Sequence, residues 1–406
     1  MTRRPLLEAC LIVRDEAVDL PGCLQSLRAL GNLLGAIRVY DTGSTDSTIA
    51  LAREFGCDVQ EGYWDDDFAR ARNASLEMSE AHWALVIDAD ERVIAMPERL
   101  CSTLERAGGA NVLTTELFHV DVEGRPSWRS RYLKMVRPDE IRFHHPIHEV
   151  VGATDGKDVR ILDLDPTELE FEHLGYADPE DMARKADRNH AIADAAVRAA
   201  RARGDRHLLA HALRHRARST SGSERIDATV SDLREAWGLL ATGTTSWVRC
   251  GTDLVHALQG AGSVLHAGSV VDQLIAGGAP RALGHRLQAE LALDAGRLGD
   301  ARRAIDELLA ASDGSDELAT AALALRLRLA LAAQERDVAL AVAALLVNRG
   351  DESRVPILVD LFRGSATMLT DLLTPALQGP HSDATLQALR DAGGLGESVA
   401  TLWARR

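Results

Sequence analysis

The segment Trp83–Glu91, WALVIDADE, decides how the first part of the chain folds. A short apolar run of this kind is typical of a strand that is buried on both faces of a parallel sheet. Ligands bind outside the carboxyl ends of such strands, so we expect Asp88 and Asp90, whose side chains point the same way on a strand, at a binding site. Two adjacent carboxylates repel each other unless a hard cation lies between them. A solvated strand end is the alternative interpretation of this segment taken alone.

Strands and helices alternate around this segment. Apolar runs at 7–13 and 36–40 and a short run at Val59 predict three further strands, with helical patterns between them, one of them at 47–55. This βαβ alternation predicts a parallel sheet in an α/β domain. Beyond a helix that ends near residue 107, additional strands are expected at 112–120, 132–136, 159–164 and 168–171. An insertion of this kind adds antiparallel strands and loops over the site.

The composition changes near Asp178, after which the sequence is rich in Ala, Leu and Arg and predicts only helices. The segment Leu291–Gly296 recurs as Leu329–Gln334, and the match continues at Ala301 and Ala339. The spacing of about 38 residues is near the roughly 34 residues of a tetratricopeptide repeat. Small Ala residues let paired helices pack closely, so we expect stacked helical hairpins, with an unrelated bundle as the alternative.

The composition of the 406-residue chain is that of a soluble globular protein of two or three domains, with 46% apolar and 26% charged residues. The net charge of -15 argues against binding of a nucleic-acid backbone, which needs clustered Lys and Arg. The cysteines are scattered without a C-x-x-C pair, so neither disulfides nor a zinc site is expected. The sequence shows no signal-peptide region and no long apolar run, and we therefore expect a cytoplasmic protein that does not enter the membrane.

Four short motifs follow one another along the N-terminal part of the chain: LIVRDE at 11–16, DTGSTD at 41–46, FARARN at 68–73 and the segment 83–91. Together they resemble the family 2 glycosyltransferases of the GT-A fold, over about residues 6–176. The branch of this family that the chain resembles has an Asp-Ala-Asp-Glu segment, an Ile-His-Glu segment and a helical-repeat tail. Some bacterial members of this branch are peptide glycosyltransferases, including S-linked ones.

The resemblance implies an α/β fold, in which a GT-A (Rossmann-like) nucleotide-sugar domain at residues 1–177 precedes an all-α, tetratricopeptide-like repeat domain at 178–406. It also implies a metal-dependent transferase that moves a sugar from a UDP- or GDP-sugar to an acceptor, with inversion. The acceptor would be the hydroxyl or thiol of a small molecule or peptide. The helical domain would bind a partner, present the acceptor or form a homodimer.

The resemblance places the nucleotide-sugar donor against Val13, Asp41, Arg72 and Asp88. A carboxylate only accepts hydrogen bonds, so Asp41 can take an N–H from uracil or guanine but gains nothing from N3 of cytosine. An Asp that only caps its turn is the alternative. The guanidinium of Arg72 matches phosphate oxygens, and Asp88 is expected near the ribose.

Asp90 is the residue that the resemblance places on a divalent cation that bridges the donor's diphosphate. Cleavage of the sugar–phosphate bond builds negative charge on the leaving diphosphate, and a metal ion offsets this charge as a Lewis acid. Oxygen ligands indicate Mn2+ or Mg2+. Many GT-A enzymes take a further protein ligand from a late His. His173, in the segment EHLGY, is the candidate, with a structural His as the alternative.

An inverting transferase needs one base that deprotonates the acceptor as it attacks the anomeric carbon. Glu149, at the end of the Ile-His-Glu segment, is the candidate, and His148 is the alternative base or a residue that orients a phosphate. Zinc at His145 and His148 is not expected, because Pro146 lies between them and no third ligand is close. A thiol acceptor, with a pKa of about 8.5, would make less demand on the base than an alcohol.

The other charged residues of the motifs receive no catalytic role. Asp65–Asp67 are expected to cap the following helix and Arg70 to form a surface ion pair, whereas Glu91 has no assignment. An interaction protein with a degenerate nucleotide-sugar domain is the alternative to an enzyme, and the intact acidic motifs argue against it. A sugar-phosphate nucleotidyltransferase would need a Gly-rich N-terminal loop, but segment 11–16 contains no glycine.

Overall fold

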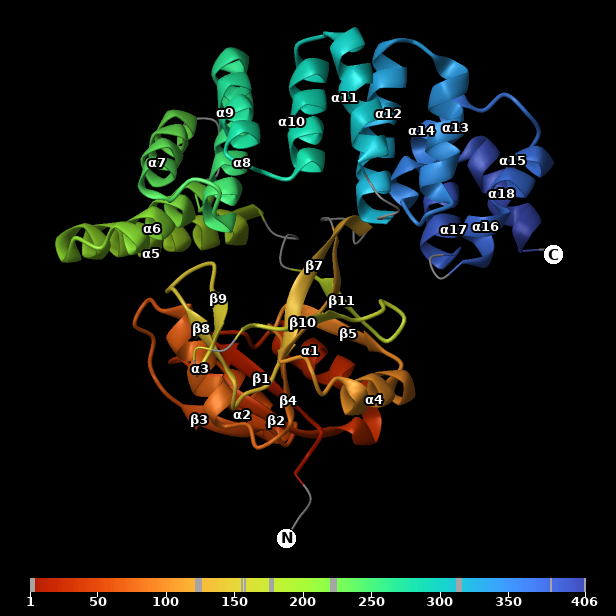
Figure 1. The fold of residues 1–406 in the computed structure, drawn as a ribbon. Helices are drawn as coiled ribbons and strands as arrows, with labels where there is room; N and C mark the ends of the chain where they lie inside the picture. Colours follow the sequence, from red (N-terminus) through yellow and green to blue (C-terminus); the bar gives the residue numbers. More distant parts are fainter. Residues whose placement is uncertain are drawn as a thin grey trace. The chain divides into compact units, whose positions relative to one another are not determined.

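The structure, a computed structural model, describes residues 4–120, 126–154, 156, 158–174, 179–219, 225–311, 316–379 and 382–404. The chain forms two compact units, Met1–Ala196 and Val197–Arg406. Figure 1 shows strands and helices in the first unit and helices throughout the second. The predicted fold class, an α/β domain followed by an all-α domain, is confirmed.

Nine of the described strands form one sheet in the order β3-β2-β1-β4-β7-β6-β11-β5, with β10 paired to β6. The half that contains β3, β2, β1 and β4 is parallel, and β7 joins it to the mixed half through an antiparallel pairing with β4. The strands are β1 (Leu7–Val13), β2 (Leu34–Asp41), β3 (Asp58–Glu61), β4 (Trp83–Val86), β5 (Glu91–Ala95), β6 (Val112–Val120), β7 (Pro126–Val136), β10 (Ile161–Asp163) and β11 (Leu169–His173). The helices before residue 110 are α1 (Leu20–Ser26), the 3-10 helix η1 (Leu27–Leu33), α2 (Thr48–Glu54), α3 (Phe68–Glu77) and α4 (Pro97–Arg106).

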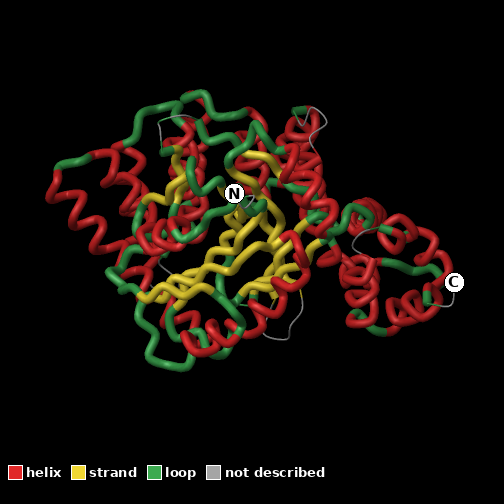
Figure 2. Tube along the Cα trace, turned by 90° about the horizontal axis from the view of Figure 1, so that it is seen from below, coloured by secondary structure: helices red, strands yellow, loops and turns green. Residues whose placement is uncertain are grey.

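Within the parallel half of the sheet, β1 and β4 are buried on both faces, and Figure 2 shows the strands of the sheet among the helices. Every second residue of β1 and β4, from Leu7 and Trp83 onward, belongs to one core with α1, η1 and α4. The residues between them, Cys10, Ala84 and Val86, belong to a second core with α3. Because neither face of β4 meets water, apolar residues are favoured at every position of this strand, and the apolar run of the Trp83–Glu91 segment follows from this burial.

The acidic end of the Trp83–Glu91 segment is a turn and not the end of a strand. β4 stops at Val86, and the N–H of Glu91 donates to the carbonyl oxygen of Asp88 at 3.1 Å. β5 then begins at Glu91 itself, and the sequence did not indicate this strand. The expectation that Asp88 and Asp90 share one face of a strand is therefore wrong, and the turn sets the directions of their side chains.

The strands predicted after residue 107 correspond to β6, the end of β7, β10 and β11. The hairpin of β8 (Ile141–His144) and β9 (Val150–Ala153) was not predicted. Each of these strands has four residues, too few for a periodic pattern to stand out. They form a separate two-stranded sheet, and the loop between them carries His148 and Glu149.

The second unit contains no strand among its described residues, and none of the described helices is long and apolar enough to cross a membrane. The helix α5 (Pro179–Arg203) begins in the first unit and ends in the second. The domain boundary expected after residue 177 stays a prediction. The following helices are α6 (Arg206–Arg218), α7 (Ile226–Leu239), α8 (Thr245–Gly260), α9 (Val264–Ala276), α10 (Arg281–Asp294), α11 (Leu298–Ala310), α12 (Asp316–Ala332), α13 (Arg336–Val347), the 3-10 helix η3 (Glu352–Arg354), α14 (Val355–Leu361), α15 (Ala366–Leu372), α16 (Thr374–Gln378), α17 (Ser382–Asp391) and α18 (Gly394–Trp403).

The predicted repeat corresponds to two successive helical hairpins, α10/α11 and α12/α13. The turns of the two hairpins have the same backbone conformation, with a φ of 68° at Gly296 and 59° at Gln334. The same helix-ending hydrogen bond of 2.8 Å closes both turns (Arg297 to Ala292, Glu335 to Ala330). The matched residues Ala301 and Ala339 are both buried. These equivalences confirm that this part of the tail is built from repeated helical hairpins.

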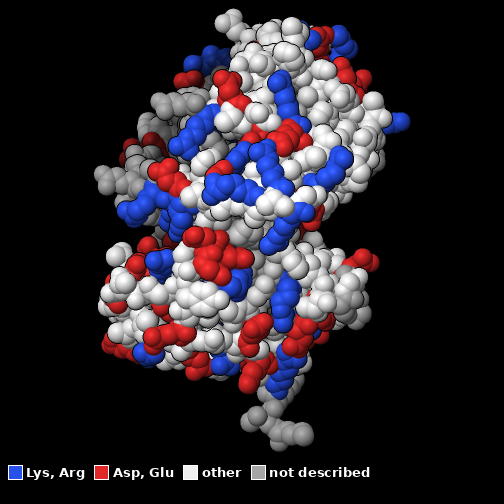
Figure 3. Space-filling view, turned by 90° about the vertical axis from the view of Figure 1, so that its left-hand side faces the viewer, with Lys and Arg blue, Asp and Glu red and all other residues white. Residues whose placement is uncertain are grey.

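Acidic and basic side chains lie next to each other on the surface, as Figure 3 shows for one face. Exposed ion pairs such as Arg53–Glu61 and Arg201–Glu235, both 2.6 Å long, account for part of this mixture. Pairs of this exposure contribute little to stability.

Gly296 and Gln334 provide a matched test of the left-handed turn. A residue other than glycine loses about 1–2 kcal/mol when its backbone is left-handed. Replacing it by glycine recovers this cost only in part, because glycine has more conformational freedom to lose from the unfolded chain. We expect Gln334→Gly to stabilise the helical unit by about 0.5–1 kcal/mol and Gly296→Ala to destabilise it by about 1 kcal/mol. No atom lies within 4 Å of a Cβ added at Gly296, so the backbone alone would cause the loss. Urea unfolding followed by circular dichroism measures both.

The control is Gly268→Ala, within α9, where φ is not left-handed and the added Cβ also meets no atom within 4 Å. Here alanine should stabilise the helix by about 0.5–1 kcal/mol. Two results would contradict a requirement for a left-handed backbone in this turn. Either Gln334→Gly would lower the free energy of unfolding, or Gly296→Ala would raise it as the control does.

Candidate functional site

The carboxyl ends of β1 and β2 bring together two of the residues expected at the donor. Val13 and Asp41 are the last residues of these strands and face each other in their register. The chain then turns at Thr42, whose N–H and hydroxyl both donate to the carbonyl oxygen of Val13, at 2.9 and 3.1 Å. Val13 and Asp41 are thereby held side by side at the edge where open α/β sheets bind ligands.

Asp41 uses only one of its two carboxylate oxygens within the described protein. Oδ1 accepts hydrogen bonds from the N–H groups of Gly43 at 2.8 Å and Ser44 at 2.9 Å. Gly43 has a φ of 110°, a conformation that favours glycine. The residue is only 1% exposed, and Oδ2 has no partner among the described residues. An unpaired buried acceptor is costly, so the donor of a bound ligand would fit at this oxygen.

Arg72 connects the acidic turn to the β8–β9 loop. Its Nη1 and Nη2 lie 3.0 and 3.1 Å from the two carboxylate oxygens of Asp88, and its Nε donates to Oε1 of Glu149 at 2.9 Å. Burial opposes the charged guanidinium, but Asp88 and Glu149 outweigh it and raise the pKa of Arg72. Although burial acts in the other direction, Arg72 holds the pKa of Asp88 below its ordinary value. The proposed base, the proposed ribose contact and the proposed phosphate contact thus form one cluster.

Asp90 lies between an imidazole and an ammonium group. Its Oδ2 is 3.5 Å from Nε2 of His173 and 3.2 Å from Nζ of Lys185, on α5. Burial favours the protonated acid, but His173 and Lys185 outweigh it and hold the pKa of Asp90 well below its ordinary value. The sequence indicated His173 but not Lys185, because Lys185 lies in the stretch assigned to the helical tail.

His119 contacts the imidazole of His173 from the neighbouring strand. The Nδ1 atoms of the two rings are 3.0 Å apart, and the two residues face each other in the register of β6 and β11. Burial and the charge of His173 lower the pKa of His119 to about 4, so this ring is neutral near pH 7. In such a pair one Nδ1 carries a proton and donates while the other accepts. The position of this proton therefore decides whether Nε2 of His173 has a lone pair available.

Glu91, which had no role in the sequence interpretation, is a structural residue. Nζ of Lys134 lies 2.5 and 2.6 Å from its two carboxylate oxygens, and both side chains are almost fully buried. Oε2 also accepts the N–H of Asp88 at 3.0 Å. Burial raises the pKa of Glu91, against the opposing charge of Lys134. Lys134 stands among the apolar residues at the end of β7, and this position was the only indication of the pair in the sequence.

Glu16, from the LIVRDE motif, adds another acid to the site. Its N–H donates to Oγ1 of Thr48 at 2.8 Å, which fixes the loop after β1. Burial, together with the charge of Asp90, raises the pKa of Glu16 to about 7, with Lys185 acting in the opposite direction. Glu16 thus lies within the electrostatic field of Asp90 in the acidic turn.

The loop between β8 and β9 holds both candidates for the base. The side chain of Glu149 is 15% exposed and fixed by Arg72. Ile147 is buried against α5, at Ile192 and Ala193. His148 has a φ of 50°, uncommon for a residue other than glycine and typical of functional loops. The loop is thus constrained at its centre and presents Glu149 toward the acidic turn.

Asp90 and His173 are of the residue types that bind Mn2+ or Mg2+ through oxygen and nitrogen. Among the described residues no group of three or more His, Cys, Asp or Glu side chains is arranged as a metal site. A carboxylate and an imidazole within 3.5 Å of each other fit a cation whose other ligands come from a diphosphate and water. The metal roles of both residues stay a prediction.

Of the three acids expected to cap α3, Asp67 does so, whereas Asp65 pairs with the side chain of Arg70 and Asp66 accepts from Nε1 of Trp64 at 2.8 Å. The expected ion pair of Arg70 is confirmed. Asp67 caps the helix, because its Oδ1 accepts the N–H of Arg70 at 2.9 Å. Asp65 forms an ion pair with Arg70 at 2.6 Å. The guanidinium of Arg70 also lies 4.1 Å from the centre of the Tyr63 ring. None of these contacts involves the acidic turn.

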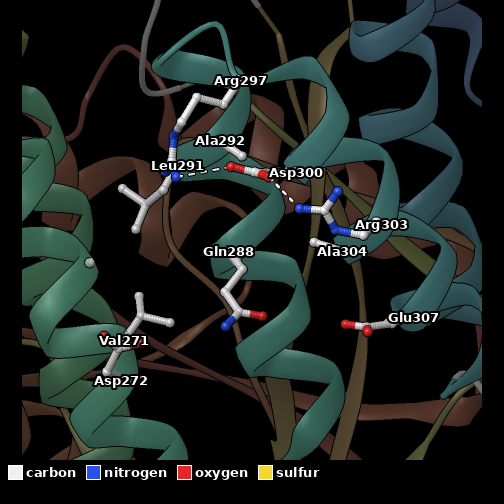
Figure 4. Close-up of a pocket in the computed structure, with 11 residues that line it drawn as sticks. Val271, Asp272, Gln288, Leu291, Ala292, Arg297, Asp300, Arg303, Ala304 and Glu307 are labelled. Atoms are coloured by element: carbon white, nitrogen blue, oxygen red, sulfur yellow. Dashed lines mark hydrogen bonds and ion pairs between the residues drawn. The ribbon is translucent and has the colours of Figure 1, made fainter.

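The second unit contains a cavity of about 370 Å³ formed by α9, α10 and α11 (Figure 4). Charged residues of both signs line it, and Asp300 accepts from Arg297 at 3.1 Å and from Arg303 at 2.5 Å. The lining is therefore largely self-neutralised. None of the residues of the acidic turn contributes to this cavity.

The strand order and the acidic turn after β4 define the first unit as a Rossmann-like domain of the GT-A type. Residues 9–155 match the family model described as Glycosyl transferase family 2. This segment of the first unit is thus similar to the family 2 glycosyltransferases, and a helical region follows it.

Several curated relatives match parts of the chain. A TPR repeat-containing protein of Synechococcus elongatus is 41% identical over 145 residues, which cover 35% of this chain and 34% of the relative. The SPbeta prophage-derived glycosyltransferase SunS of Bacillus subtilis is 34% identical over 88 residues, which cover 21% of this chain and 20% of the relative. The chain thus spans about a third or less of the length of these relatives.

Solved structures resemble the chain more distantly. S. aureus TarS in complex with UDP has 14% identity and a TM-score of 0.38, over 67% of this chain and 88% of that one. Glucosyl-3-phosphoglycerate synthase from Mycobacterium tuberculosis, in complex with Mn2+, UDP and glucosyl-3-phosphoglycerate, has 21% identity and a TM-score of 0.24, over 28% and 44%.

The buried pair of Glu91 and Lys134 provides a stability test. Lys134→Met leaves the Glu91 carboxylate buried without its cation, so the free energy of unfolding should fall by about 3–5 kcal/mol. Adding Glu91→Gln to this variant removes the buried charge and should restore part of the loss. Denaturant unfolding of the three proteins, followed by tryptophan fluorescence, measures the effect.

The matched control is Arg53→Met, which breaks a pair of similar length whose side chains are 55% and 58% exposed. This change should cost less than about 1 kcal/mol. If Lys134→Met lowered the free energy of unfolding no more than Arg53→Met does, the pair of Lys134 and Glu91 would not anchor the turn.

Proposed function

We propose that the chain is an inverting glycosyltransferase that moves a sugar from a UDP- or GDP-sugar to a hydroxyl or thiol of a small molecule or peptide. The observation that carries the proposal is the buried Oδ2 of Asp41, which has no partner among the described residues, at the same edge of the sheet as the acidic turn after β4. Both lie in the segment that matches the family 2 model. A relative named as a glycosyltransferase, SunS, supports the same class of reaction.

Asp41 selects the nucleobase in this proposal. Its Oδ1 is committed to the two N–H groups of its own turn, which leaves Oδ2 for an N–H of uracil or guanine. Val13 lies in register beside it and would form the apolar wall of the base site. Asp88, whose side chain is 39% exposed, would accept from a ribose hydroxyl.

Asp90 and His173 would hold Mn2+ or Mg2+, which supplies Lewis-acid stabilisation of the charge on the leaving diphosphate. For His173 to present a lone pair at Nε2, its Nδ1 must carry the proton and donate to Nδ1 of His119. His119 then acts as a positioning residue, because it fixes the tautomer and the ring plane of His173.

Glu149 takes the proton of the acceptor as the acceptor oxygen or sulfur bonds to the anomeric carbon. The bond from that carbon to the donor oxygen breaks, and its electron pair leaves with the nucleoside diphosphate. The hydrogen bond from Arg72 orients the Glu149 carboxylate. A thiol, with an unperturbed pKa of about 8.5, needs less help from a base than an alcohol. His148 is the alternative base.

A variant of Asp41 tests the donor site. Asp41→Asn keeps an oxygen for the turn N–H groups but loses the charged acceptor, so the affinity for the matching nucleotide should fall about 10- to 100-fold with little change in stability. The measurement is the thermal shift and calorimetry of UDP, GDP and CDP with Mn2+. Asp58→Asn, at a carboxylate that is 61% exposed, is the control. If neither UDP nor GDP raises the melting temperature of the unchanged protein, the donor assignment is wrong.

A variant of Glu149 tests the base. Glu149→Gln should slow transfer by about 100-fold or more while UDP affinity stays within about twofold, because the amide cannot accept the acceptor's proton. Activity is measured with the donor found by the nucleotide panel and a set of thiol and hydroxyl acceptors. His148→Gln serves as the comparison. A large loss with His148→Gln and none with Glu149→Gln would transfer the role to His148.

A further inference from the structure

Lys185 brings a positive charge from α5 to the acidic turn. Its Nζ lies 3.2 Å from Oδ2 of Asp90, and its side chain is 36% exposed. Lys185 belongs to the first unit, although it lies beyond the matched family segment 9–155. The ammonium group that pairs with Asp90 therefore comes from a part of the chain that the family match does not cover.

The packing of α5 fixes the position of Lys185. Ile192 and Ala193, further along the helix, are 4% and 0% exposed and pack on Ile147 of the β8–β9 loop. The guanidinium of Arg188 lies 5.1 Å from the centre of the Phe68 ring, at the start of α3. The contact between Lys185 and Asp90 thus results from a helix that is docked onto the loop carrying Glu149.

Lys185 and a divalent cation compete for the same carboxylate. Two like charges about 4 Å apart repel each other, and water and salt weaken this repulsion only a little in a partly buried site. A metal ion on Asp90 would therefore displace the ammonium group toward another anion. The diphosphate of the donor is the anion that the metal brings, and the flexible stem of a lysine can follow it.

We propose, on the basis of the proposed function, that Lys185 is a diphosphate-binding residue. It pairs with Asp90 before the donor binds and moves to the donor's diphosphate when a divalent cation takes Asp90. Lys185 thereby opposes metal binding in the absence of nucleotide and supports nucleotide binding in the presence of metal. These opposite effects separate the proposal from a purely structural role, which would not strengthen metal binding.

The test is Lys185→Met in the full chain. Without nucleotide, Mn2+ titration followed by electron paramagnetic resonance should show about three- to tenfold tighter binding than in the unchanged protein. At saturating Mn2+, calorimetry should show UDP binding weakened about tenfold. Lys185→Arg, which keeps the charge, should restore UDP binding to within about threefold. Arg184→Met removes the neighbouring cation of α5 and should change neither affinity.

The outcomes distinguish this proposal from the proposed function. If the unchanged protein binds UDP with Mn2+ but Lys185→Met binds it equally well, Lys185 does not contact the diphosphate and the transferase assignment stands. Mn2+ binding that is weakened or unchanged in Lys185→Met, or absent from both proteins, also overturns the proposal. If the unchanged protein binds neither UDP nor GDP, the proposed function fails and this inference fails with it. Circular dichroism of Lys185→Met and Lys185→Arg confirms that the comparison is between folded proteins.

Discussion

The acidic turn depends on the ion pair between Lys134 and Glu91. An ammonium and a carboxylate that leave water each lose several kcal/mol of hydration, so a buried pair is tolerated only with close contact and further hydrogen bonds. Both conditions are met here, at 2.5 and 2.6 Å between the charged groups and 3.0 Å from the N–H of Asp88 to Glu91. The pair ties the turn to β7, and it leaves Asp88 and Asp90 on the more exposed side of the turn, where a ligand can reach them.

Arg72 fixes the geometry of the cluster. Its guanidinium holds Asp88 and Glu149 together and thereby sets the distance between the proposed ribose contact and the proposed base. In the proposed reaction, a thiol acceptor ionises more readily than an alcohol and would need less proton transfer to that base in the transition state.

The sequence predicted the buried strands because a strand that is buried on both faces consists of a continuous run of apolar residues. The residues of β1 and β4 meet a core on both faces, and a continuous apolar run is the direct consequence. The extent of β4 and the existence of β5 were not predictable in this way, since a turn of four residues followed by a half-buried strand has no periodic signature. Asp41 was identifiable from its motif, but its unpaired oxygen appears only when the turn at Gly43 and Ser44 is built.

Arg72 was expected at the site from the segment 68–73, but Lys134 and Lys185 could not be predicted, because each comes from an element without a motif of the site. Arg72 lies on α3, Lys134 on β7 and Lys185 on α5, and only the fold brings them to the acids of the turn. The exposed fraction of each of these three side chains agrees with its proposed role. The side chain of Lys134 is 8% exposed and that of Arg72 is 16% exposed, and both hold fixed carboxylates, whereas Lys185 is 36% exposed. The acid expected to take a metal ion is thus paired with the cation that can leave it most easily.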